Sequence, residues 1–181
     1  LTQITKDIRL GFGVTLMPHE FIHPVRVAEK VATVDVLSKG RVEWGIGRST
    51  PMEQIAFGVD IPRSKEKMLA ACKTVVGMWE QEYYSEDSEF LKFPPRMVTP
   101  KPWQDPHPPV WLAASSHESA GFAGENGLGA ATTAFTGGVL RHARALMAIL
   151  NPTINAYRRL QPDSLAPTHA NWGLDNRATF I

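Results

Sequence analysis

Three polar positions along this chain combine residue types that can hold an anion. Arg48 follows an alternating apolar segment that ends in glycine, and Ser115 and Ser116 directly precede a segment with a helical pattern. An arginine guanidinium is a permanent, fork-shaped charge that matches phosphate oxygens. Serine hydroxyls and the first backbone N–H groups of a helix also attract anions, and the helix dipole adds to the attraction. If these positions meet in the fold, they form a phosphate site.

Each of these residues also has a purely structural interpretation. Arg48 can be a solvated charge at a strand end, and Ser115 and Ser116 can be simple helix caps. Gly45 and Gly47 do not form a dinucleotide fingerprint, so we interpret them as glycines that serve close packing. The sequence alone leaves the choice between a phosphate site and these structural roles open.

Histidine and cysteine point to no further reactive centre. His19 and His23 lie in a polar turn and are interpreted as turn residues, although either can approach a ligand pocket from a loop that follows a strand. The sequence has no H-E-x-x-H motif and no paired-cysteine spacing, so we expect no metal site. The one cysteine, Cys72, excludes an internal disulfide and favours a reducing, cytoplasmic location.

Strand and helix patterns alternate along the chain and must position these residues. Short apolar runs bounded by proline or glycine indicate strands, and apolar residues at i, i+3, i+4 and i+7 indicate amphipathic helices. This alternation predicts a parallel sheet, either in a barrel or in a doubly wound form. The expected strands are 8–17, 41–47, 110–114 and 128–134, and the expected helices are 24–38, 64–80 and 115–126.

Two local signals refine this pattern. Ser115 and Glu118 have the spacing of a capping box, which predicts the start of the third helix. Residues 83–109 contain half of the 14 prolines of the chain, which excludes a regular helix and predicts a long excursion. Excursions of this kind often carry function.

Length and charge limit the fold and the partners. The fold class is α/β, with about four βα units of a partial TIM barrel, because a closed barrel takes about 250 residues and this chain has 181. A net charge of +1 favours neither nucleic acid nor an anionic membrane, and no stretch is apolar enough to span a bilayer. The first residues lack a signal-peptide pattern and are interpreted as a chain entered midway. Because an open half-barrel has two unpaired edges, we expect homo-oligomers.

Co-linear blocks between Arg9 and Ala134 resemble the luciferase-like family of flavin-dependent monooxygenases. The blocks match in order and spacing and comprise residues 11–18, 23–29, 37–48, 57–60, 100–110 and 113–116. The resemblance implies a TIM barrel that uses reduced flavin mononucleotide (FMN) and O2 to oxidise an organic substrate. The deazaflavin F420 is the alternative cofactor, because a sister branch of the family uses it.

The resemblance also implies roles for individual residues. Arg48 corresponds to an arginine that holds the flavin phosphate, and Ser116 and Ser119 correspond to polar groups at the phosphate-binding start of a helix. Ser115 stands where the family usually has an acidic residue, so this chain departs from the pattern there. Gly13 and Val14 correspond to a strand end that supports the isoalloxazine ring, where the family often has a cis non-proline peptide bond. The resemblance assigns no catalytic residue.

From Phe135 onward the sequence resembles a different family, the catalytic domain of glutamine synthetases. Residues 135–150, 151–160 and 166–177 match it in order and spacing. The resemblance implies that Arg159 binds glutamate and that Arg177 binds a nucleotide phosphate. The metal-binding glutamates and the ATP segment of that family are absent, so we expect no ligase activity. The alternative interpretation is an amphipathic helix followed by an extended tail.

The chain is thus predicted to join two partial units, 1–134 and 135–181. Domain boundaries normally fall in flexible linkers, and none is visible here. A truncated or chimeric chain explains this junction better than a bifunctional enzyme. We expect a flavin-dependent monooxygenase that is incomplete and has little activity in this chain. The alternatives are a glutamate–amine ligase fragment and a composite chain without activity of its own.

Overall fold

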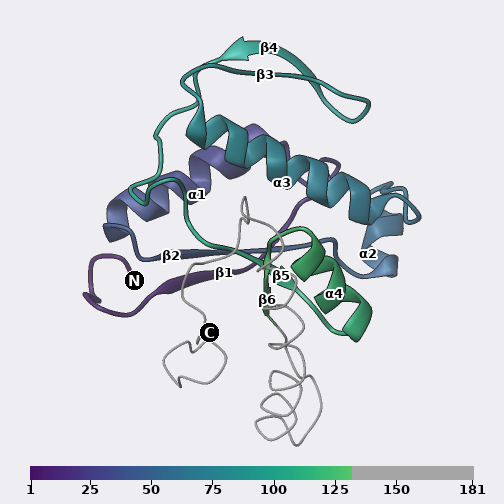
Figure 1. Cartoon of the computed structure of the whole chain (residues 1–181), viewed down its shortest axis with the longest axis horizontal. Coiled ribbons are helices and arrows are strands. Elements are labelled where there is room, and N and C mark those ends of the chain that lie inside the picture. The colour runs from purple at the N-terminus through teal and green to yellow at the C-terminus, as the bar shows by residue number, and fades with distance from the viewer. Residues whose placement is uncertain (132–181) are drawn as a thin grey trace, which may run out of the picture.

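The computed structural model describes residues 1–131, and its centre is a parallel four-stranded sheet (Figure 1). The sheet contains β1 (Leu10–Leu16), β2 (Val42–Gly47), β5 (Val110–Ala113) and β6 (Gly129–Ala131), in that spatial order. Phe12 pairs with Trp44, and Leu112 pairs with both Ile46 and Ala130. Strands that follow one another along the chain are neighbours in the sheet. This order is that of a barrel, since a doubly wound sheet reverses its strand order at a switch point.

Helices connect these strands and cover the sheet. α1 (Pro24–Ser38) and α3 (Ser64–Glu80) lie side by side above β1 and β2, and α4 (His117–Glu125) packs beside β5 and β6 (Figure 1). The prediction of a helix over 64–80 is confirmed at both ends. A short helix, α2 (Pro51–Ala56), was not predicted, because its six residues are too few to show an apolar period.

The hydrophobic core lies between the sheet and the pair α1 and α3. Trp44 of β2 packs edge to face against Trp79 of α3, with ring centroids 5.0 Å apart. The indole N–H of Trp79 in turn donates to the carbonyl of Ala28 in α1, at 3.1 Å. Every residue of β2 is buried, as expected for a central strand of a parallel sheet. Side chains at Trp44 and its alternate neighbours face the helices, so Glu43, Gly45 and Gly47 face the opposite side, which is the inner, concave side in a barrel.

The proline-rich excursion contains a β-hairpin that the sequence patterns did not predict. β3 (Tyr84–Asp87) and β4 (Lys92–Arg96) pair antiparallel and lie above α3 (Figure 1). Two adjacent prolines, Pro94 and Pro95, obscure the strand pattern, but a two-stranded ribbon tolerates them because each strand has a free edge. The ring of Tyr84 occupies the space that a Cβ at Gly77 would need.

The end of the excursion has a structural role. The buried carboxylate of Asp35, at the end of α1, accepts hydrogen bonds from the backbone N–H groups of Trp103 and Gln104, both at 2.9 Å. The side-chain amide of Gln104 donates to Asp35 and to the carbonyl of Val42, also at 2.9 Å. These bonds hold the excursion at the N-terminal end of β2. In barrel proteins this end contributes stability, whereas ligands bind at the other end.

Some sequence-based expectations lie outside the described residues. They are the last part of the fourth strand, 132–134, and the helical and extended segments expected within 135–181. None of the helices in the described part is long and apolar enough to cross a membrane.

Candidate functional site

Arg48 follows the C-terminal end of β2, and Ser115, Ser116 and Ser119 follow the C-terminal end of β5. Backbone hydrogen bonds continue past the strands there, from Met17 N–H to the Gly47 carbonyl at 2.9 Å and from Ala114 N–H to the Ala131 carbonyl at 2.7 Å. These bonds keep the end of β1 in register with that of β2, and the end of β5 in register with that of β6. Arg48 therefore leaves β2 beside the segment in which β5 leads into α4. In barrel enzymes ligands are bound at this end of the strands.

β1 carries a bulge at the position that the resemblance assigns to ring support. The peptide bond between Gly13 and Val14 is cis, as the resemblance implies. The pairing with β2 shifts at this point, so that the span from Phe12 to Thr15 lies opposite the shorter span from Trp44 to Ile46. The extra residue in β1 leaves Gly13 and Val14 displaced from the regular ladder.

Glycines of β2 accommodate this bulge. A Cβ at Gly45 would lie 2.1 Å from the carbonyl oxygen of Phe12, and a Cβ at Gly47 would lie 2.9 Å from Cγ2 of Val14. Both positions lie on the concave face, with Ala113 of β5 next to Gly47 at 3.9 Å between Cβ positions. The interpretation of both glycines as packing residues agrees with this geometry.

The concave face near the strand ends is lined by small side chains. Gly13, Val14 and Ala113 are exposed, and Val14 retains 40% of its accessible surface. Apart from Gly13 itself and its two chain neighbours, no described residue has an atom within 4 Å of a Cβ built on Gly13. A planar aromatic ligand can therefore approach the backbone closely here.

Arg48 is held by a neutral partner. Its Nη1 donates to Oγ of Ser64 at 3.0 Å, and Ser64 is the first residue of α3. In the part of the chain that the structure describes, Arg48 forms no ion pair with a carboxylate. Arg48 is half-buried, and the permanent charge of an arginine guanidinium suits the binding of an anion.

The first turns of α3 connect several strand-end segments. Lys65 forms an ion pair with Glu118 of α4, and Lys67 forms one with Glu20 in the loop after β1. The hydrogen bond from Lys65, the charge of Lys65 and then the charge of Arg48 lower the pKa of Glu118. Arg48 is thus close enough to the start of α4 to act on its first turn. Sequence patterns did not indicate Ser64, Lys65 or Glu118 as parts of this site.

The start of α4 differs by one residue from the prediction. The N-cap is Ser116, whose Oγ accepts from Ser119 N–H at 3.2 Å, while Oγ of Ser119 accepts from Ser116 N–H at 3.0 Å. The capping box therefore joins Ser116 and Ser119, and the predicted box of Ser115 and Glu118 is wrong. Glu118 instead reaches Lys65, and Ser115 is exposed just before the helix. Ser116 and Ser119 combine the capping role with a location at the strand ends.

The two histidines have structural contacts. His23 is the N-cap of α1, and its Nδ1 accepts from Val25 N–H at 3.3 Å. Burial, followed by the charges of His19 and Arg26, lowers the pKa of His23. His19 lies 3.5 Å from a carboxylate oxygen of Glu20. Their interpretation as turn residues agrees with these contacts.

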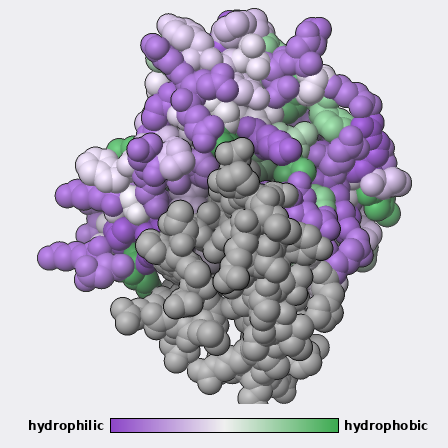
Figure 2. Space-filling model, viewed as in Figure 1, coloured by the Kyte–Doolittle hydropathy of each residue, from purple (hydrophilic) through white to green (hydrophobic). Residues whose placement is uncertain are grey.

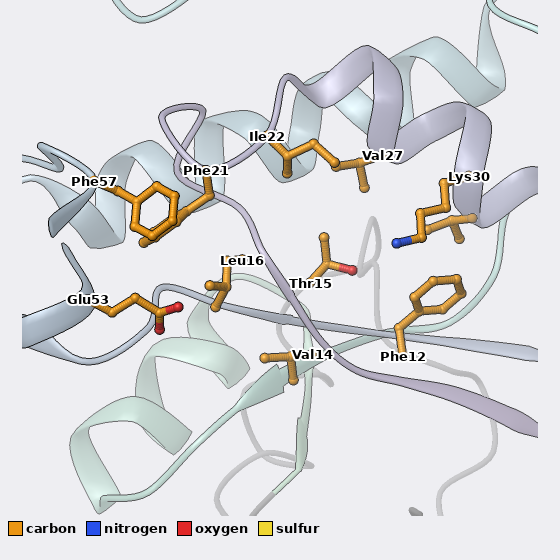
Figure 3. Close-up of a pocket in the computed structure, with 11 residues that line it drawn as sticks. Phe12, Val14, Thr15, Leu16, Phe21, Ile22, Val27, Lys30, Glu53 and Phe57 are labelled. Atoms are coloured by element: carbon orange, nitrogen blue, oxygen red, sulfur yellow. The ribbon is translucent and has the colours of Figure 1, made fainter.

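A pocket of about 330 Å³ lies along β1 and is also lined by residues of α1 and α2 (Figure 3). Phe21 and Phe57 stand together at one end, with ring centroids 4.9 Å apart, and Phe12 and Lys30 lie at the other end. Val14 lines this pocket, but Arg48 and the serines before and within α4 do not. The pocket is therefore distinct from the candidate phosphate site.

Figure 2 shows mainly hydrophilic side chains on the visible face, with scattered hydrophobic ones between them. Met52 and Ile55 of α2 are among the exposed hydrophobic residues. Residues 1–131 contain no group of three histidine, cysteine or acidic side chains that could hold a metal ion. Arg159 and Arg177, assigned to the ligase-like segment, lie outside the described residues.

Curated relatives of this chain include two kinds of enzyme. The oxygenase component of the flavin-dependent trigonelline monooxygenase of Acinetobacter baylyi is 34% identical over 130 residues, which are 70% of this chain and 35% of that protein. Glutamine synthetase of Pyrococcus abyssi is 50% identical over 60 residues, which are 33% of this chain and 14% of that enzyme. The second resemblance is thus confirmed as a short, partial match.

Solved structures show the same fold. The monooxygenase RslO1 from Streptomyces bottropensis matches with a TM-score of 0.70 at 26% identity, covering 89% of this chain and 48% of that one. The oxygenating constituent of 3,6-diketocamphane monooxygenase from Pseudomonas putida, in complex with FMN, matches with a TM-score of 0.69 at 16% identity. This match covers 88% of this chain and 46% of that one. F420-dependent tetrahydromethanopterin reductase from Methanopyrus kandleri matches with a TM-score of 0.66 at 19% identity, covering 90% of this chain and 48% of that one. The last two likenesses concern the fold alone.

These comparisons agree with the parallel sheet of the described residues. The chain spans about a third of the curated monooxygenase and about half of the solved structures that it matches. The prediction of a partial TIM barrel is confirmed by the sequential parallel strands and by these structural neighbours. The family model of luciferase-like monooxygenases matches residues 1–153, most of the sequence. The chain therefore belongs to the luciferase-like monooxygenase family.

Proposed function

We propose that this chain binds the phosphate and one ring face of reduced FMN, as part of a monooxygenase that oxidises an organic substrate with O2. The observation that carries the proposal is the arrangement around Arg48. Arg48, half-buried and with a neutral hydrogen-bond partner, follows the C-terminal end of β2, next to the end of β5 that leads into α4. Positive charge at a helix N-terminus is the usual environment of a bound phosphate.

The described residues fit a flavin at two places. Arg48, Ser116, Ser119 and the first N–H groups of α4 would hold the phosphate, with exposed Ser115 beside them. Arginine donates two parallel hydrogen bonds to a phosphate and retains its charge at every physiological pH. The serine hydroxyls rotate, so they can exchange their capping partners for phosphate oxygens.

The bulge in β1 would support the flavin ring. Gly13, Val14 and Ala113 form an exposed surface of small residues. Gly47 has no side chain that would project from this surface beside Val14. These residues present backbone and small apolar groups to a planar ring and exclude water from one of its faces. Reduced flavin supplies the activation of molecular oxygen, which side chains cannot perform by themselves. The chain's contribution is to bind and orient the ring.

FMN is favoured over F420 by the relatives. The trigonelline monooxygenase, 34% identical to this chain, is named as flavin-dependent. The FMN-bound diketocamphane enzyme and the F420-dependent reductase both share the fold only, at 16% and 19% identity, so F420 is the second candidate. Both cofactors carry phosphate, and the same Arg48 site would receive either. Direct comparison of the two ligands separates them.

The first experiment is thermal unfolding of the chain with excess FMN, riboflavin or F420. Riboflavin has the same ring as FMN but no phosphate. A ligand at a hundred times its dissociation constant adds about 2.7 kcal/mol to stability. We expect FMN to raise the midpoint more than riboflavin does, and Arg48→Ala to remove this difference. Arg26→Ala is the matched control, because Arg26 is an exposed arginine that pairs with Glu29 on α1. Equal shifts with both flavins, or no shift, would contradict the proposal.

The match to glutamine synthetase supports a second, limited proposal. We propose that residues 135–181 derive from such an enzyme and that Arg159 and Arg177 hold no substrate in this chain. The matched glutamine synthetase is covered over only 14% of its length, too little for an ATP site. Addition of ATP and Mg²⁺ should therefore leave the unfolding midpoint unchanged. A rise with ATP and Mg²⁺ would favour the ligase alternative.

A further inference from the structure

We propose that Ser64 is a positioning residue, whose buried hydroxyl orients the guanidinium of Arg48 toward the flavin phosphate. The inference rests on the proposed phosphate site. It assigns a role to a residue on α3 that lies 16 positions away from Arg48 in the sequence. The role follows from how the Ser64 hydroxyl is bonded.

The hydroxyl of Ser64 has one orientation that satisfies both of its neighbours. Its Oγ donates to the carbonyl of Ile61 at 2.8 Å, which uses its only proton. The oxygen is then left as an acceptor for Nη1 of Arg48, at 3.0 Å. Ser64 has 0% of its surface exposed, so water does not compete for these bonds. The guanidinium is thus hydrogen-bonded to a buried hydroxyl whose orientation is fixed by its bond to Ile61.

A neutral partner suits this task better than a carboxylate. An arginine side chain loses conformational entropy when it is immobilised, which opposes the binding of a ligand. A hydrogen bond that is already formed in the free protein reduces the part of this cost that falls on ligand binding. A carboxylate would orient Arg48 as well, but it would also offset its charge and compete with the phosphate. Serine orients the guanidinium and leaves its charge available.

The bonding of Ser64 differs from that of a helix cap. The N-cap of α3 is Arg63, which makes no side-chain cap hydrogen bond, and Ser64 is the first residue inside the helix. Its hydroxyl donates to the carbonyl of Ile61, before the helix, and accepts from Arg48, after β2, so both partners lie outside α3. The bond to Ile61 serves the local turn, whereas the bond from Arg48 connects α3 to the end of β2.

Ser38 provides a matched control. It is 2% exposed, and its Oγ also donates to the carbonyl three residues earlier, that of Asp35, at 3.1 Å. Its backbone carbonyl accepts from Nε of another arginine, Arg41, at 2.8 Å. Ser38 precedes β2 and Ser64 follows it, so the two serines lie toward opposite ends of the sheet. Ser38→Ala therefore removes a similar buried hydroxyl without touching the candidate site.

The test is fluorescence titration of oxidised FMN and of riboflavin against the wild-type chain and its variants. The readout is the ratio of the two dissociation constants, because a general loss of structure weakens both ligands. We expect Ser64→Ala to weaken FMN binding about tenfold, the scale of one hydrogen bond to a charged group, with riboflavin unchanged. Ser38→Ala should leave the ratio at the wild-type value. In the Arg48→Ala background, Ser64→Ala should have no further effect on the ratio.

The outcomes separate this inference from the proposed function. If the wild-type chain binds FMN and riboflavin equally, the phosphate site itself is wrong. If wild type prefers FMN and Arg48→Ala abolishes the preference, but Ser64→Ala keeps it, the role of Ser64 is overturned. Should Ser64→Ala fail to fold, Ser64→Cys replaces it, because a thiol fills the site and accepts hydrogen bonds weakly. The thiol variant must then also show a reduced preference, and an unchanged ratio would refute the role.

Discussion

Gly45 of β2 lies directly against Phe12 of β1, so closely that a Cβ at Gly45 would stand 2.1 Å from the Phe12 carbonyl oxygen. Real Cβ atoms do not approach backbone oxygen at this distance. The absence of a side chain at this position is therefore what lets the bulge of β1 pair with β2. The surface formed by Gly13 and Val14 depends on this contact.

Gly45→Ala is expected to destabilise the chain. The methyl group meets backbone rather than a flexible side chain, so the two strands must separate, at a cost of about 1–3 kcal/mol. Gly121→Ala is the control, because Gly121 is inside α4 and a Cβ there would meet no described atom within 4 Å apart from its chain neighbours and the backbone of its own helix. Alanine in a helix interior should stabilise by up to about 1 kcal/mol. Urea unfolding of both variants measures the difference, and a Gly45→Ala chain as stable as wild type would contradict the packing role.

Glu43 is expected to make stability depend on pH. Its buried side chain accepts from the indole N–H of Trp111 at 2.6 Å and pairs with Arg9. Burial raises the pKa of Glu43, and the bonds from Trp111 and Arg9 oppose this shift only in part. A raised pKa means that the folded state binds the proton more tightly than the unfolded chain does. The stability contribution is therefore complete below about pH 4.3, the ordinary Glu value, and is lost as pH rises through the folded pKa.

Glu43→Gln isolates this effect. The amide oxygen still accepts from Trp111, but the side chain no longer titrates. Urea unfolding at several pH values should show that wild type loses stability relative to Glu43→Gln as pH rises above about 4.3. A difference that stays constant, or that grows in favour of wild type, would contradict the burial of an ionising carboxyl here.

Cys72 is expected to resist thiol reagents in the folded chain. The side chain is fully buried in α3, and burial raises the pKa of its thiol to about 12. The thiolate is the reactive form, so both access and ionisation oppose reaction at neutral pH. Labelling with a disulfide reagent at pH 8 should proceed only after unfolding in urea. Rapid labelling of the native chain would show that α3 opens locally. The chain has a single cysteine, so each label reports this site.

Removal of the charge on Glu118 is expected to strengthen FMN binding. The carboxylate pairs with Lys65 and acts on Arg48, so it competes with an anionic ligand for both cations. Glu118→Gln should raise FMN affinity about two- to fivefold at low salt, with a smaller effect at physiological salt because exposed charges are screened. Glu29→Gln, which removes an exposed partner of Arg26 on α1, is the control. Unchanged FMN affinity at low salt would contradict the proximity of Glu118 to the phosphate.

Local sequence patterns predicted elements well where the governing interactions are local. The apolar period over 64–80 and the proline at the start of α1 determine helices by short-range geometry, and both helices have the predicted bounds. The hairpin β3–β4 was missed because its strands are stabilised by contacts with α3, such as Tyr84 on Gly77, that leave no periodic signal. The capping box was placed one residue early because Glu118 pairs with Lys65, 53 positions away, rather than with its own helix start.

The sequence by itself determined the alternation of strands and helices, the family to which the chain belongs, and the candidate residues Arg48, Ser115 and Ser116. These depend on residue types, on their spacing and on blocks that keep their order along the chain. Only the tertiary structure decided which groups surround Arg48. The buried hydroxyl of Ser64 and the carboxylate of Glu118 come from two other helices, and their approach results from the packing of α3 and α4 against the sheet. These contacts join residues that are far apart in the sequence, so the spacing of residue types along the chain does not predict them.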